Sequence, residues 1–214
     1  MQTTDQRVII FDFGGVLVDW NPRYLYRKLF GDDTAGMERF LTEVCTLEWN
    51  GHQDAGRPLS EATAELLARH PEHADLINAY YERWPEAVSG PIEGTVSILR
   101  ELKDSGRRLY GLTNWSHETF PRARTLFHFF SWFDGIVVSG EERVVKPHPE
   151  IYRRLLSRYA IDPAAAVFID DNRGNVDAAA ALGIHAIHFQ SPDQLRAELT
   201  SAGLLAEPRA GLRD

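Results

Sequence analysis

Residues 8–15, with the sequence VIIFDFGG, decide the fold that the rest of the chain follows. Four apolar residues run without interruption to Asp12, and Gly14 and Gly15 come soon after it. A short continuous apolar run bounded by glycine is typical of a strand that is buried on both faces, as in a parallel sheet. Residues 8–11 are therefore predicted to form a buried strand that ends at Asp12.

Four further segments resemble this strand, and helical patterns separate most of them. The strand-like segments are residues 108–113, 135–139, 166–170 and 185–189. The helical patterns lie around residues 96–102, 151–159 and 176–182. Alternation of strands and helices predicts right-handed βαβ units and hence a parallel sheet. The predicted fold class is α/β, with a Rossmann-like parallel-sheet core.

The segment between the first two predicted strands departs from this alternation. From residue 21 to about residue 90, apolar residues recur only with helical spacing, in stretches at 37–44, 59–67 and 76–81. We therefore predict that a small all-helical domain is inserted into the sheet domain. The expected boundaries are residues 21–90 for the helical domain, and residues 1–20 and 91–205 for the α/β core.

Composition excludes several classes of function. The 214 residues carry a formal net charge of −8, which argues against a nucleic-acid partner. No apolar run reaches the length of about 18 residues that spans a membrane, and residues 1–7 are polar, so we expect a cytoplasmic protein without a membrane partner. Cys45, the single cysteine, lies in an apolar stretch and is predicted to be a small buried hydrophobe.

Polar residues gather where the predicted strands end. In an open parallel sheet, ligands bind beyond the carboxyl ends of the strands. Neighbouring carboxylates at a buried strand end repel each other and lose solvation, and a divalent cation removes both costs. The composition of this edge therefore predicts a site for a metal ion and an anionic substrate. The residues concerned are Asp12, Thr113, Asn114, Lys146, Asp170 and Asp171.

Four motifs in this order resemble those of the haloacid dehalogenase (HAD) superfamily of hydrolases. They are FDFGGVLVD at 11–19, LTN at 112–114, Lys146 before Pro147, and IDDNRGNVDAA at 169–179. The match runs from about residue 7 to residue 189. The helical insert lies where members of subfamily IA carry a helical cap of the C1 type. The sequence also resembles the sugar-phosphate phosphatases of that group.

The resemblance implies a Mg²⁺-dependent phosphatase that acts on a small phosphorylated metabolite, possibly a sugar phosphate. Asp12 would attack phosphorus and form an aspartyl-phosphate. It would also bind Mg²⁺ together with the Gly14 backbone carbonyl and Asp171, and Asp170 would support this shell directly or through water. Asn175 would orient a metal ligand or the lysine of the third motif.

The remaining implied roles concern the substrate. Thr113 and Asn114 would hydrogen-bond the phosphoryl oxygens, and Lys146 would neutralise charge developing on them. Trp20 and Asn21 lie where the chain leaves the core for the insert, so they are expected to line the entrance. The resemblance leaves the oligomeric state open.

One residue departs from the family pattern. Phosphatases of this superfamily usually carry a second aspartate two residues after the nucleophile, which transfers protons, and here that position is Gly14. Either the leaving group needs little protonation, as in an anomeric sugar phosphate, or another residue such as Asp19 or His52 substitutes, or turnover is slow. Two alternative functions stay open: a metal-independent 2-haloacid dehalogenase, and a non-catalytic protein that binds a phosphorylated ligand.

Several aromatic and polar residues have two interpretations. One stretch of the insert could contact a polar leaving group, or it could be a solvated helix face with its tryptophan in the core. Its residues are Glu48, Trp49, His52 and Gln53. Trp115 is ambiguous in the same way, whereas Trp84 and Trp132 are predicted to be packing residues.

Overall fold

A five-stranded parallel sheet forms the centre of the computed structural model, which describes residues 7–206. The strand order is β5-β4-β1-β6-β7, so the strand from the opening motif is the middle one. This confirms the predicted α/β class and all five predicted strands. Their bounds are β1 Val8–Phe11, β4 Leu109–Thr113, β5 Gly135–Val138, β6 Ala166–Asp170 and β7 His185–His188.

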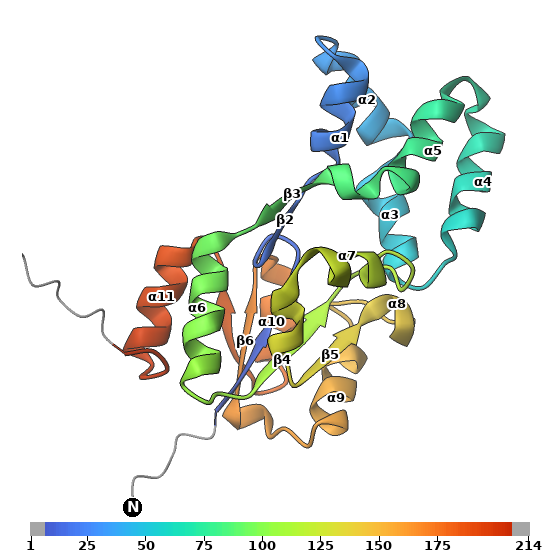
Figure 1. The fold of residues 1–214 in the computed structure, drawn as a ribbon. Coiled ribbons are helices and arrows are strands. Elements are labelled where there is room, and N and C mark those ends of the chain that lie inside the picture. The colour runs from blue at the N-terminus through green and yellow to red at the C-terminus, as the bar shows by residue number, and fades with distance from the viewer. Residues whose placement is uncertain (1–6, 207–214) are drawn as a thin grey trace, which may run out of the picture.

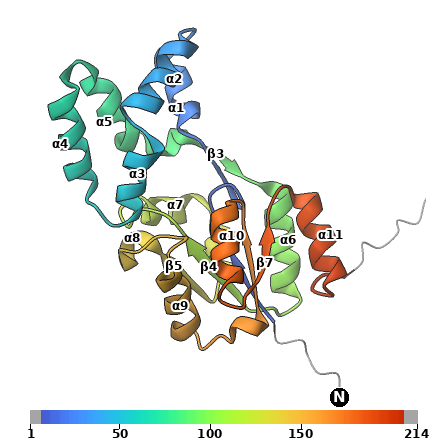
Figure 2. The same cartoon turned by 180° about the vertical axis from the view of Figure 1, so that it is seen from behind.

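Helices cover both faces of the sheet, as Figures 1 and 2 show from opposite sides. Side chains of a strand alternate between the two faces. Ile9 and Phe11 accordingly pack in one buried cluster with α6 and α11, while Val8 and Ile10 pack in another with α9 and α10. The bounds of these helices are α6 Glu93–Asp104, α9 Pro149–Arg158, α10 Arg173–Ala180 and α11 Pro192–Ser201.

The segment between β2 (Val18–Trp20) and β3 (Val88–Pro91) contains five α-helices, which project beyond one end of the sheet (Figure 1). They enclose a separate apolar cluster around Tyr26, Phe40 and Tyr80. Cys45 is buried in this cluster, as expected for a structural cysteine. No helix in the described part of the chain is long and apolar enough to cross a membrane. The five helices are α1 Pro22–Phe30, α2 Thr34–Glu43, α3 Leu47–Asp54, α4 Leu59–Arg69 and α5 Ala74–Glu82.

The remaining elements are short. They are α7 Phe120–Leu126, α8 Ser139–Glu142 and the 3-10 turns Pro71–His73, Trp84–Ala87, His128–Trp132 and Pro163–Ala165. Residues 1–6, which contributed to the expected cytoplasmic location, lie outside the described part of the chain.

A two-stranded antiparallel ribbon, absent from the sequence prediction, joins the helical insert to the core. It consists of β2 Val18–Trp20 and β3 Val88–Pro91. The expectation that residues 21–90 are only helical was therefore wrong for β3. Gly90 and Pro91 have low strand propensity, and this short segment is extended because it pairs with β2. Trp20 of the ribbon contacts the apolar clusters of both the core and the insert.

The insert also contacts the core at a second place, away from the ribbon. The Ser139 hydroxyl donates to the backbone carbonyl of Asp54 at 2.5 Å. The backbone N–H of Leu59 donates to the Glu118 carboxylate at 2.7 Å. Arg122 donates to the backbone carbonyl of Tyr81 at 2.8 Å. The ribbon and these hydrogen bonds together place the insert over the carboxyl edge of the sheet.

The aromatic packing beneath this edge depends on a glycine in β4. The Phe13 ring lies 4.9 Å from that of Phe130 and 5.2 Å from that of Phe133, measured between centroids. A Cβ at Gly111 would overlap the Phe13 ring. Gly111 is therefore required by this close approach.

Gly111→Ala is expected to lower the free energy of unfolding by about 1–3 kcal/mol, because the added methyl group overpacks this site. Gly51→Ala, in α3, is a matched control, since a Cβ at this position meets nothing within 4 Å. The substitution also replaces a glycine inside a helix, which favours the helix. The control should be neutral or stabilising in chemical denaturation. Equal stability of the two variants would contradict this account of the packing.

Candidate active site

The pairing of β1 with β6 brings two carboxylates side by side. Phe11 is aligned with Ile169, and the Asp12 backbone N–H donates to the Ile169 carbonyl at 2.9 Å. The residue after each of these two is an aspartate, so Asp12 and Asp170 lie side by side at the carboxyl ends of β1 and β6. Both are buried. Two such carboxylates need positive charge close by.

Lys146 provides that charge. Its Nζ lies 2.9 Å from Asp12 Oδ1 and 2.7 Å from Asp170 Oδ2, and its side chain is fully buried. Burial disfavours the charged lysine, but the two carboxylates outweigh it and raise the Lys146 pKa above its usual value. Burial and the charge of Asp170 in turn outweigh the attraction of Lys146 and raise the pKa of Asp12 to about 8.

Asn114 holds the backbone of Lys146 in place. The amide Nδ2 of Asn114 donates to the Lys146 carbonyl at 2.9 Å, and its Oδ1 accepts from the Lys146 N–H at 2.8 Å. These two bonds tie the loop between α8 and α9 to the end of β4. In the structure the Asn114 amide engages the lysine backbone, and its expected bond to a phosphoryl oxygen stays a prediction.

Asp170 has a nearly complete set of hydrogen-bond donors. Asn175 Nδ2 donates to both of its oxygens, at 3.0 and 3.1 Å, and the Asn172 backbone N–H donates at 2.8 Å. With Lys146 added, this carboxylate is held from three sides. Asn175 thus lies where it can orient an acidic residue and its lysine, which is the position that the fourth motif implied.

Asp171, in contrast, is exposed at the edge of the site. Its carboxylate packs over Gly15, where a Cβ would overlap it, and Gly15 has a φ of +73°. A side chain at this position would be both strained and obstructed. Partial desolvation of the carboxylate by its neighbours, together with the charge of Asp170, raises the pKa of Asp171 above its usual value. The positive charge of Lys146 opposes this shift only in part.

The three aspartates have the composition of a divalent-cation site. Asp12, Asp170 and Asp171 each offer an oxygen, and these atoms lie within 4.8 Å of one another. Mg²⁺ binds oxygen ligands and usually retains several waters, so a few carboxylates are enough to hold it. The residues present fit this ion. The pKa values of Asp12 and Asp171 are raised because their charged forms are disfavoured, and a bound cation would favour those charged forms.

Thr113 adds an unused hydroxyl to the site. It is buried at the end of β4, and its Oγ1 has no hydrogen-bond partner among the described residues. An unpaired buried hydroxyl costs free energy, which an oxygen of a bound ligand would recover. Thr113 can therefore donate to a substrate oxygen.

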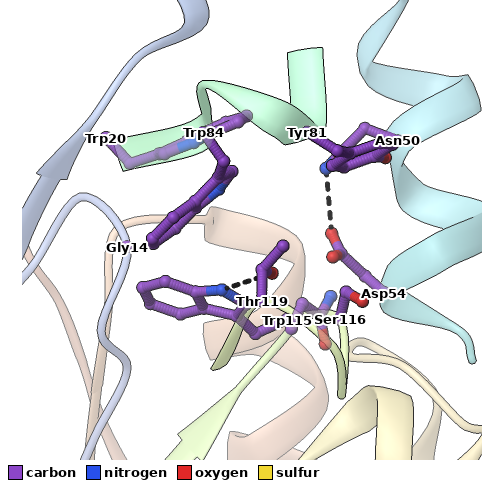
Figure 3. Close-up of a pocket in the computed structure, with 10 residues that line it drawn as sticks. Gly14, Trp20, Asn50, Asp54, Tyr81, Trp84, Trp115, Ser116 and Thr119 are labelled. Carbon is purple, nitrogen blue, oxygen red and sulfur yellow. Dashed lines mark hydrogen bonds between the residues drawn. The ribbon is translucent and has the colours of Figure 1, made fainter. Parts of the chain in front are cut away.

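A cavity of about 70 Å³ adjoins these residues and extends to the helical insert (Figure 3). Gly14 and Asn114 lie on its core side. Four aromatic residues form much of its wall, and polar groups from both parts of the chain complete it. The lining residues are Gly14, Trp20, Asn50, Asp54, Tyr81, Trp84, Asn114, Trp115, Ser116 and Thr119.

Of the two interpretations of residues 48–53, the structure agrees with the second, in which the tryptophan belongs to the core and the polar residues do not face the cavity. Trp49 and Gln53 are buried, and Glu48 and His52 line a different hollow on the insert. The same helix presents residues 50 and 54 to the cavity instead. These two positions are four apart and share a face, but the helix amphipathicity is too weak to show which face meets the core.

Trp20 and Asn21, both expected at the entrance of the site, have different positions. Trp20 lines the cavity as predicted, whereas Asn21 caps α1 by accepting from the Arg23 N–H at 3.0 Å. Trp84, predicted to be a packing residue, packs in the core cluster and also forms part of the cavity wall. Trp115 lies 5.7 Å from it, centroid to centroid, and has the same double role.

Lys146→Met is expected to lower the free energy of unfolding at pH 7 by about 3–5 kcal/mol, because two buried carboxylates lose their counter-charge. The loss should shrink as the pH falls. Carboxylates whose folded-state pKa is raised bind protons more tightly when folded, so lower pH favours the folded state. Lys103→Met removes an exposed lysine 3.4 Å from Asp134 and is the control for urea denaturation. A loss at Lys146 no larger than the control's would refute this charge balance.

Comparison with known proteins extends these observations. The family model for haloacid dehalogenase-like hydrolases matches residues 6–183. The sesquiterpene phosphatase astK of Aspergillus oryzae is 28% identical over 186 residues, which cover 87% of this chain and 91% of that protein. A phosphorylated carbohydrates phosphatase of Thermotoga maritima is 26% identical over 187 residues, which cover 84% of this chain and 83% of that protein.

A solved structure shares the fold over nearly the whole chain. It is a HAD family enzyme of Bacteroides thetaiotaomicron in complex with magnesium and inorganic phosphate. The identity is 18% and the TM-score is 0.63, with 97% of this chain and 99% of that chain covered. Because the family model matches most of the sequence, including the strands that carry the aspartates and Thr113, the chain belongs to the haloacid dehalogenase-like hydrolases.

Proposed function

We propose that this hydrolase is a Mg²⁺-dependent phosphatase that acts on a small phosphorylated metabolite through an aspartyl-phosphate on Asp12. The observation that carries the proposal is the oxygen cluster of Asp12, Asp170 and Asp171 with Lys146 beside it. A metal-independent dehalogenase gains nothing from a third carboxylate at this edge. A phosphoryl group, in contrast, requires cationic groups next to the nucleophile.

In the first half of the reaction, an Asp12 oxygen attacks phosphorus. The new bond joins Asp12 to phosphorus, the bond from phosphorus to the leaving oxygen breaks, and that oxygen takes a proton. In the second half, water attacks the same phosphorus and gives up a proton, the bond to Asp12 breaks, and inorganic phosphate leaves. Asp12 returns as a carboxylate, so the protein is unchanged after one turnover.

The neighbouring residues stabilise charge and hold geometry during both halves. Lys146 lies against the nucleophile and offsets negative charge on the phosphoryl oxygens. Thr113 donates its free hydroxyl to one of them. Asn175 and Asn114 keep Asp170 and Lys146 in position. Bound at the aspartates, Mg²⁺ would supply the further positive charge that lets an anionic nucleophile approach an anionic phosphate.

The helical insert is proposed to act as a cap that selects the leaving group. On this view residues 21–90 form the cap domain, and residues 1–20 and 91–205 form the core domain. The aromatic cavity favours a leaving group with an apolar face. The C–H face of a sugar satisfies this requirement in part, and a terpenoid chain satisfies it more fully. The Aspergillus relative is named as a sesquiterpene phosphatase, which is a phosphatase for such a chain. A cytoplasmic location is also proposed, and a single cysteine, which cannot form an intramolecular disulfide, is compatible with it.

Phosphate release should require both Mg²⁺ and Asp12. With para-nitrophenyl phosphate and a panel of natural phosphate esters, we expect release that EDTA abolishes and that excess Mg²⁺ restores. Asp12→Asn should lower kcat by about 10³-fold or more, because an amide is a poor nucleophile at phosphorus. Asp177→Asn, which alters an exposed carboxylate on α10, is the control. Metal-independent turnover, or full activity of Asp12→Asn, would rule out the proposed chemistry.

The aromatic wall predicts an order of preference within the panel. Prenyl and benzyl phosphates should have a lower KM than glycerol 3-phosphate, because their leaving groups place apolar surface against the tryptophans. Steady-state kinetics on these esters under identical Mg²⁺ conditions provides the comparison. A preference for glycerol 3-phosphate would show that the cavity does not bind the leaving group.

A further inference from the structure

The core lacks a group that can transfer a proton at the position next to the nucleophile. Gly14 stands where related phosphatases usually have a second aspartate, and a Cβ built there meets nothing within 4 Å. The space beside Gly14 is part of the cavity between the core and the insert. An alkoxide leaving group needs a proton, so the donor must come from another wall of this cavity.

One carboxylate lies on the opposite wall. We propose, on the basis of the phosphatase function above, that Asp54 is the general acid and base of the reaction and replaces the aspartate that is absent at Gly14. Asp54 ends α3 in the helical insert, and its side chain and Gly14 line the same cavity. A leaving group that fills the cavity from the Gly14 side therefore reaches Asp54.

The side chain of Asp54 is directed into the cavity by its neighbours. Asn50, one turn earlier on α3, donates Nδ2 to Asp54 Oδ2 at 3.3 Å, as Figure 3 shows. The Ser116 backbone N–H, from the core, lies close enough to lower the pKa of this carboxyl. The hydrogen bond from Asn50 thus orients the group and leaves acceptor capacity for a ligand.

The backbone of Asp54 is anchored to the sheet domain. Its carbonyl accepts from the Ser139 hydroxyl, and the oxygen of that hydroxyl accepts from the Trp115 N–H at 2.9 Å. Ser139 is the first residue after β5, and Trp115 lies two residues after the end of β4. The position of Asp54 relative to the nucleophile is therefore set by the strands that carry the active site, and not by the insert alone.

The protonation behaviour of Asp54 suits this role. Burial raises its pKa to about 7, and the Ser116 N–H only partly opposes that shift. The last turn of a helix also carries partial negative charge, which favours the protonated carboxyl. A general acid and base is most effective when its pKa is near the working pH, because both forms are then available.

The substitutes suggested by the sequence are less well placed. Asp19 accepts from the Tyr24 hydroxyl at 2.8 Å and does not line the cavity. His52 is exposed and lines the other hollow on the insert. Within residues 7–206, Asp54 is the acidic residue that lines the cavity shared with Gly14.

The proposed steps balance as follows. As the bond from phosphorus to the leaving oxygen breaks, that oxygen keeps the electron pair and takes the proton of Asp54. The Asp54 carboxylate then accepts a proton from water while the water oxygen bonds to phosphorus and the bond to Asp12 breaks. Phosphate leaves, Asp12 is again a carboxylate, and Asp54 is again protonated.

The test compares two leaving groups in Asp54→Asn. We expect kcat/KM for an alkyl phosphate such as benzyl phosphate to fall by about 10²–10⁴-fold, because an alkoxide needs the lost proton. For para-nitrophenyl phosphate, whose leaving group departs as a stable anion, the fall should be less than about tenfold. This second substrate also reports that the variant is folded. Glu48→Gln removes another carboxylate from α3, outside the cavity, and should leave both values unchanged.

Two further readouts separate proton transfer from a structural role. With para-nitrophenyl phosphate, Asp54→Asn should release a burst of about one nitrophenol per enzyme before slow turnover, since water lacks its base. Adding Gly14→Asp to this variant should restore part of the benzyl phosphate activity, because the open space at Gly14 admits the side chain.

Two results would overturn the role of Asp54. One is an equal loss of kcat/KM for the two substrates, without a burst and without rescue, which would make Asp54 a structural contact between insert and core. The other is full activity of Asp54→Asn. Both differ from failure of the phosphatase function itself, in which the wild-type protein releases no phosphate from either ester.

Discussion

The ammonium group of Lys146, held between Asp12 and Asp170, is the interaction on which the rest of the site depends. The sheet register places the two carboxylates together in a buried position, where each disfavours ionisation of the other. Lys146 offsets part of this repulsion by pairing with both carboxylates, beside the proposed nucleophile Asp12. Because Lys146 comes from a loop, its placement requires Asn114 at the end of β4. Three strand ends and one loop thus have to be assembled before any of these residues can act.

The charge balance of this cluster also explains why it suits a metal ion. Lys146 faces Asp12 and Asp170, while Asp171 is at the outer edge. Three carboxylates and one lysine leave net negative charge at the site. A divalent cation complements that charge through oxygen ligands, which are the ones it prefers. Close packing limits what can change here, since Gly15 lies under the Asp171 carboxylate.

The insert has a part in the chemistry if Asp54 transfers the proton. The core supplies the nucleophile and the cationic groups, and the insert supplies the aromatic wall and the carboxylate at the far side of the cavity. The insert side of the cavity then both recognises the leaving group and protonates it. The ribbon of β2 and β3 and the hydrogen bond from Ser139 set the distance between the two halves. Motion of the insert on the ribbon would change both binding and catalysis together.

The sequence by itself determined the sheet, the helical insert and the residues at the strand ends. Buried strands and amphipathic helices are local patterns, and the carboxyl edge of a parallel sheet collects whatever follows each strand. Asp12, Thr113, Lys146 and Asp170 could therefore be assigned to one site without a structure. The tertiary structure decided the partners within it, such as the use of the Asn114 amide by the Lys146 backbone. It also decided which face of α3 meets the core, because that face depends on contacts between residues far apart in the chain. Asp54 was missed for this reason. Its neighbours Ser116 and Ser139 come from the core, and the sequence pattern of α3 does not predict these contacts.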